Sequence, residues 1–136
     1  MRDFPVEKLK PLLGRLIADP VGLSIEIPLA PFTIDQEVVE TSIFLGGVSL
    51  PTTDVLKLAG QTFSFPVNPK PGYIDGSVYV QHAHHPVDVT SIRFGPADGN
   101  AIEIELDLLF VFEFEGLDDY RNTSWTVITR LSNSEK

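Results

Sequence analysis

All three histidines of this chain lie within four residues, inside the stretch Gly76 to Gly95, GSVYVQHAHHPVDVTSIRFG. If this stretch is a β-strand, His82 and His84 project to one face and His85 projects to the other. Two imidazoles at that spacing can hold one metal ion, and the carboxylate of Asp88 follows a few residues later. Such nitrogen and oxygen ligands suit zinc, iron, nickel or manganese. His82, His84 and Asp88 are therefore the candidate metal ligands, and the cofactor would be a divalent transition metal.

The spacing of this stretch resembles the first metal-binding motif of the cupins, which are jelly-roll proteins. Five residues separate Gly76 from His82, three separate His84 from Asp88, and six separate Asp88 from Gly95. The resemblance covers about twenty of the 136 residues and implies a metal-binding protein or metalloenzyme. The chain departs from the pattern in two ways, since Asp88 stands where cupins carry glutamate and no histidine follows in the later sequence. A cupin-type site would therefore lack one ligand.

A second interpretation, which we favour, places the histidines at the rim of two paired strands. Val78 and Val80 share a strand face with His82 and His84, so the strand would run from the core into a polar end. Pro86 cannot donate a ladder hydrogen bond, and AHHP would then connect two strands. A third interpretation is a contact sensitive to pH, because histidine titrates near neutrality.

A second group of candidate residues is suited to binding a protein. Three carboxylates alternate along residues 103–107, and the polar loop 117–122 adds acidic, aromatic and arginine side chains. Carboxylates attract a basic partner, and tyrosine and arginine are frequent interface anchors. The candidate partner-binding residues are Glu103, Glu105, Asp107, Asp118, Asp119, Tyr120 and Arg121. A solvated strand face and an ordinary loop are the alternatives.

No catalytic residues are identified. The chain has no cysteine, its serines lie outside nucleophile-elbow settings, and it has no glycine-rich phosphate loop. The net charge is −9, from 19 acidic and 10 basic residues. That charge opposes binding to nucleic acid or to an anionic membrane surface. The N-terminus has no uninterrupted apolar run, so we expect no export signal and a cytoplasmic location.

The strongest structural pattern is AIEIELDLLFVFEFEG, residues 101–116. Apolar side chains occupy every second position from Ile102 to Phe114, and carboxylates take most of the positions between them. Strand side chains alternate with period two, so this segment predicts a strand with a core face and an acidic face. Leu109 and Val111 interrupt the acidic face and indicate that part of the outer surface is covered.

The remaining elements are predicted from shorter patterns. Residues 22–28, 36–45, 73–83, 87–95 and 123–131 read as strands between turn-rich connections. Apolar residues recur at spacings of three and four in 3–18, which predicts a short helix within an N-terminal helical segment, residues 1–20. Residues 132–136 are expected to form a frayed tail.

Together these elements predict a single all-β domain over residues 1–136. We expect an antiparallel two-sheet sandwich, like a jelly roll, with one short N-terminal helix. A single closed barrel is the alternative architecture. The expected function is that of a non-enzymatic, soluble, acidic binding module of the inhibitor or immunity type. Its partner would be another protein, possibly basic, and a homo-oligomer is left open. The cupin-like metalloprotein is the competing hypothesis.

Overall fold

The computed structural model describes residues 2–113 and 120–133, and the chain there is almost entirely β-structure. Two short 3₁₀ turns, η1 (Val6–Lys8) and η2 (Val55–Leu58), are the helical elements of this part of the chain. The strands are β1 (Arg2–Asp3), β2 (Gly14–Asp19), β3 (Gly22–Pro28), β4 (Phe32–Ile34), β5 (Glu37–Val39), β6 (Ser42–Gly46), β7 (Thr62–Ser64), β8 (Asp75–Val80), β9 (Ala83–Asp98), β10 (Ala101–Phe110), β11 (Tyr120–Arg121) and β12 (Thr123–Asn133).

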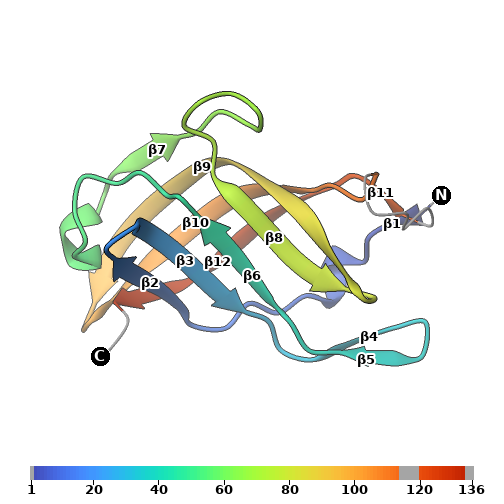
Figure 1. The fold of residues 1–136 in the computed structure, drawn as a ribbon. Coiled ribbons are helices and arrows are strands. Elements are labelled where there is room, and N and C mark those ends of the chain that lie inside the picture. The colour runs from blue at the N-terminus through green and yellow to red at the C-terminus, as the bar shows by residue number, and fades with distance from the viewer. Residues whose placement is uncertain (1, 114–119, 134–136) are drawn as a thin grey trace.

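Seven of these strands form a closed barrel. Their order around the ring is β10-β12-β2-β3-β6-β8-β9, and β9 pairs with β10 to complete it. Every neighbouring pair is antiparallel except β12 with β2, which run parallel. Strand β7 adds to one side of β9, and β4 and β5 form a hairpin that extends from one end of the barrel (Figure 1).

The prediction of an all-β fold is confirmed, but the two-sheet sandwich or jelly roll is wrong. The reason lies in β9, which at 16 residues pairs with β8 through its first part and with β10 over most of its length. One strand thus joins the two halves of the sheet, and the sheet closes on itself. Inward and outward side chains alternate in the same way in a sandwich and a barrel, so the sequence pattern fits both.

The predicted N-terminal helix is also wrong, since the described residues before strand β2 contain one 3₁₀ turn, η1, and no α-helix. Pro11 and Gly14 both disfavour a helix. Leu16 is buried in the barrel, and the Asp19 carboxylate accepts the backbone N–H groups of Val21 and Gly22, which turns the chain into β3. The apolar residues of this segment recur at helical spacing, but they belong to strand β2 and to the chain that leads into it.

The strand predicted over residues 101–115 is confirmed for Ala101–Phe110, which form β10, whereas residues 111–113 are not in a strand. Ile102, Ile104 and Leu106 are fully buried, whereas Glu103 is exposed on the opposite face. Phe112 is buried beyond the end of the strand, and Phe114 and Glu115 lie outside the described residues. The barrel interior is filled by side chains of this kind from all seven strands.

The C-terminal strand β12 continues to Asn133, two residues into the tail that was predicted to fray, and the rest of that tail lies outside the described residues. Within residues 2–113 and 120–133, no helix is long and apolar enough to cross a membrane.

Candidate functional site

The histidine stretch forms the hairpin between β8 and β9. Val80 pairs with Ala83, and the two residues between them, Gln81 and His82, have φ angles of 50° and 71°. Positive φ at both positions is the backbone of a type I′ turn. His82 therefore sits exposed at the tip of a hairpin and does not share a strand face with His84.

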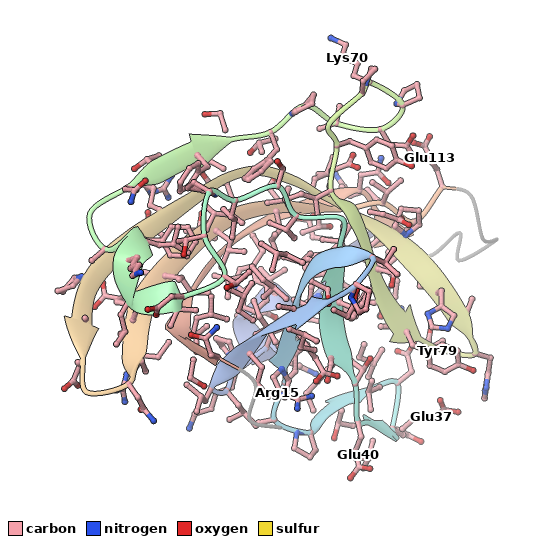
Figure 2. The ribbon with its side chains drawn as sticks, turned by 60° about the vertical axis from the view of Figure 1, so that its left-hand side comes forward. Arg15, Glu37, Glu40, Lys70, Tyr79 and Glu113 are labelled. Carbon is pink, nitrogen blue, oxygen red and sulfur yellow. The ribbon has the colours of Figure 1, made fainter. Side chains whose placement is uncertain are left out.

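His84 and His85 point to opposite sides of β9. His84 is exposed on the outer surface, and its ring lies 4.8 Å from that of Tyr79, which Figure 2 shows near the hairpin tip. His85 is buried, with Nε2 3.1 Å from the Val80 carbonyl oxygen and its ring 5.1 Å from Phe112. Because a carbonyl only accepts, Nε2–H is the donor. His85 therefore serves as a core residue.

The predicted metal ligands are not brought together. His82 lies in the turn, His84 lies against Tyr79, and Asp88 lies further along β9 in a cleft described below. In residues 2–113 and 120–133 no group of three or more His, Cys, Asp or Glu side chains is arranged to hold a metal ion. The fold also lacks the jelly roll that the cupin-like spacing implied.

Two carboxylates on the acidic face of β10 form ion pairs with one arginine. Arg93, on β9, forms ion pairs with Glu105 and Asp107, the latter with Nη1 3.0 Å from Oδ2. Hydrogen bonds from Arg93, Ser91 and Thr126 lower the pKa of Asp107 to about 2. A basic partner would have to compete with this arginine, so Glu105 and Asp107 are poor binding groups. Glu103 stays exposed on the same face.

The loop candidates have structural partners where the structure describes them. Tyr120 is buried, its ring lies 5.3 Å from that of Phe4, and the Arg2 guanidinium sits 4.7 Å above it. Arg121 pairs with Asp3, with Nε 3.0 Å from the carboxylate. Asp118 and Asp119 lie outside the described residues. Tyr120 is therefore a core residue and cannot anchor a partner at the surface.

A cleft on the outer face of the barrel is the candidate binding site that remains once these predicted residues are placed. Its volume is about 420 Å³, and it lies where β9 and the end of β10 meet the loop between β7 and β8. Apolar groups form much of its lining, together with two carboxylates and two amides. The lining residues are Asn68, Pro69, Pro86, Asp88, Leu109, Val111, Glu113 and Asn122.

Backbone and amide hydrogen bonds hold this cleft in shape. The Val111 N–H donates to the Pro86 carbonyl at 2.9 Å, which ties the chain after β10 to β9. Asn122 accepts the Phe112 N–H at 2.9 Å and donates its Nδ2–H to Glu113 at 3.3 Å. The amide is thereby oriented, and the Glu113 carboxylate is held at the cleft.

Asp88 is the unusual group in the cleft. It is partly buried, and this burial raises the pKa of its carboxyl group above the ordinary value. No described cation forms an ion pair with Asp88 or with Glu113. Lys70 belongs to the loop beside the cleft, but Figure 2 shows its side chain directed away from the barrel, with Glu113 nearer to the strands. The cleft thus holds negative charge that the described residues do not compensate.

A second hollow of about 460 Å³ adjoins the cleft at Leu109, which lines both. Its carboxylate is Asp107, which Arg93 already bonds. Sequence reasoning singled out Asp88 for a metal and missed the cleft. The interruption of the acidic face by Leu109 and Val111 was the available signal, and Val111 is indeed buried beneath this part of the surface.

Comparison with protein families, with curated proteins and with solved structures finds no match for this chain.

Proposed function

We propose that this protein is a non-enzymatic binding module whose partner is a protein that places a lysine or arginine side chain in the cleft beside Asp88. The observation that carries the proposal is the partly buried Asp88 carboxylate without a cationic partner among the described residues. Burial without compensation disfavours the charged form, and an incoming cation would restore the missing interaction.

The lining of the cleft suits the two parts of such a side chain. Leu109, Val111 and Pro69 can contact the apolar stem of a lysine or arginine, while Asp88 and Glu113 can accept hydrogen bonds from its charged head. Arginine is favoured over lysine where two carboxylates lie together, because its planar guanidinium presents several donors at once.

The overall charge of −9 would assist this association from a distance. An acidic surface steers a basic partner toward itself, and this steering weakens as salt screens the charges. An inhibitor or immunity-type protein, which neutralises another protein by covering a basic site, fits this chemistry. The association rate with the partner is expected to fall as ionic strength rises.

The proposal can be tested before the partner is known, with a small probe of the bound group. Uniformly ¹⁵N-labelled protein is titrated with N-acetyl-arginine amide and followed by amide chemical shifts. N-acetyl-citrulline amide, which has nearly the same shape without the charge, is the matched ligand control. We expect saturable shifts around Asp88, Val111 and Asn122 with the arginine probe, and none with citrulline.

Substitutions test whether arginine binds in the cleft or at any acidic surface of the protein. Asp88→Asn and Glu113→Gln are each expected to weaken arginine binding several-fold, because each removes one charge-assisted acceptor. Glu103→Gln removes the same charge from the exposed strand face and is expected to leave binding unchanged. Shifts spread evenly over all acidic surfaces, or equal losses in all three variants, would show that the cleft is not the site.

A further inference from the structure

The cleft beside Asp88 continues along the barrel surface into the second hollow. Leu109 lines both spaces, and their volumes are about 420 Å³ and about 460 Å³. Strands β9, β10 and β12 lie side by side in this part of the barrel (Figure 1). Residues of β9 and β10 line both spaces, and so do residues at the start of β12 or directly before it. The two spaces therefore form one groove with two binding positions.

The two positions are offset by two residues along the strands. On β9 the cleft is lined by Asp88 and the second hollow by Thr90. On β10 the cleft is lined by Leu109 and Val111, and the second hollow by Asp107 and Leu109. A step of two residues along a strand is about 7 Å. An extended peptide has the same step between neighbouring side chains on one face, so residues i and i+2 of a bound segment can enter the two positions together.

The two positions differ in the charge that they leave unpaired. In the second hollow, Oδ1 of Asp107 accepts hydrogen bonds from Thr126 at 3.1 Å and from Arg93 at 3.4 Å. Its Oδ2 accepts hydrogen bonds from Ser91 at 2.9 Å and from Arg93 at 3.0 Å. These four bonds occupy the lone-pair positions of the carboxylate, which leaves no acceptor for a further cation. Asp88, in contrast, forms no ion pair with a described residue.

The lining of the second hollow indicates which uncharged side chain would fit it. Leu109 is partly exposed and offers an apolar contact. Thr90, Ser124 and Thr126 are exposed and each carries a hydroxyl group. Tyrosine combines an apolar ring with a hydroxyl that both donates and accepts hydrogen bonds, so it can use both kinds of lining group. An anionic side chain would be repelled by the carboxylate of Asp107.

We propose that the groove binds an extended segment of the partner, in which an arginine or lysine enters the cleft and a tyrosine two residues away enters the second hollow. This inference rests on the proposed function, because its first position is the cleft beside Asp88. It adds the spacing and the second side chain by which the partner would be recognised.

Peptides of identical composition test the spacing. Uniformly ¹⁵N-labelled protein is titrated with acetyl-Arg-Gly-Tyr amide and with its isomer acetyl-Arg-Tyr-Gly amide, which places the two side chains next to each other. The reversed pair, acetyl-Tyr-Gly-Arg amide and acetyl-Gly-Tyr-Arg amide, covers the opposite chain direction. We expect the spaced peptide of one pair to bind about five- to tenfold more tightly than its isomer, because contact with Leu109 removes apolar ring surface from water. Only that peptide should also shift the amides of Thr90, Ser124 and Thr126.

The same titrations separate this inference from the proposed function. N-acetyl-arginine amide reports on the cleft alone. If it shifted Asp88 while spaced and adjacent isomers bound equally in both pairs, the second position would be refuted and the proposed function would stand. If it did not bind at the cleft, the proposed function and this inference would both fail.

A substitution locates the tyrosine. Ser124→Phe fills the second hollow from β12 and is expected to remove the preference for the spaced peptide. Thr33→Phe makes a comparable change at an exposed position of β4 that lines neither space, and it is expected to keep the preference. Both positions are exposed, so circular dichroism should show native folding in each variant. A preference that survives Ser124→Phe, or that is lost equally in Thr33→Phe, would overturn the assignment of the tyrosine to this hollow.

Discussion

Replacing Gly76 with alanine is expected to destabilise this barrel, whereas replacing Gly95 is not. Both glycines belong to the spacing that resembles a cupin motif. If the motif explained them, the two substitutions would have similar effects, whereas a packing role predicts different effects. Gly76 is paired with Val87 across β8 and β9. A Cβ added at Gly76 would lie 2.4 Å from the Val87 carbonyl oxygen and 3.1 Å from Leu45 Cδ2.

The size of the effect follows from what must move. The closest atom at Gly76 belongs to the backbone of a paired strand, so relief requires shifting that strand within a closed ring. Overpacking of this kind costs about 1–3 kcal/mol. At Gly95 the nearest atom is the Glu103 Cβ at 3.3 Å, so a shift of only a few tenths of an ångström relieves the contact, and no backbone atom lies as close as at Gly76. Alanine there should be neutral or stabilising by up to about 1 kcal/mol, because glycine loses more backbone freedom on folding.

Urea unfolding, monitored by circular dichroism and by Trp125 fluorescence, measures both variants against the unsubstituted protein. Equal slopes would show that the denatured states are comparable. If Gly76→Ala were as stable as the parent, or if the two variants were equally destabilised, the close approach of β8 to β9 would be wrong.

Three other predictions concern charge and packing. Asp107 has a lowered pKa, so its stabilising contribution is present above pH 3.8 and is lost as the pH falls to about 2. Because the side chain is 40% exposed, this contribution should stay below about 1 kcal/mol, and Asp107→Asn should remove it from the pH dependence of urea unfolding. Asp88 has a raised pKa, so its ionised form destabilises the fold. Asp88→Asn should therefore increase the free energy of unfolding at pH 7 and give no gain below pH 3.8. A loss of stability at pH 7 would contradict this. Phe110 is fully buried and Phe44 is 44% exposed, so thermal unfolding should show a loss of about 3–5 kcal/mol for Phe110→Ala and a much smaller one for Phe44→Ala.

The strand at residues 101–110 was predictable because its pattern is local. Seven apolar residues at alternate positions, from Ile102 to Phe114, leave little choice of secondary structure, and the described members of the set are buried. The opposite orientation of His84 and His85 follows from the same period of two. His82 breaks that rule because Gln81 and His82 form the turn, and a two-residue turn without glycine gives a weak sequence signal.

The cleft was less predictable because its parts are far apart in the chain. Asp88, Glu113 and Pro69 meet only after β9, β10 and the loop before β8 are placed. The removal of Glu105 and Asp107 from the candidate binding groups depends likewise on Arg93, which lies on the neighbouring strand. Tyr120 was taken for a surface anchor because nothing in its local sequence shows that Phe4 packs against it.

The amino-acid sequence by itself determined the all-β class, the buried face of strand β10 and the negative net charge. Each of these depends on neighbouring residues or on composition. Only the tertiary structure decided that the sheet closes into a barrel and that residues 14–19 become strand β2. It also decided that Asp88 lies in a partly apolar cleft, where no cation of the described residues pairs with it. These features depend on pairing between distant segments, such as β2 with β12 and β9 with β10. The alternation of side chains along a strand determines whether a residue points into the sheet's apolar face or away from it. Which residues it then contacts depends on the pairing of all the strands in the closed barrel.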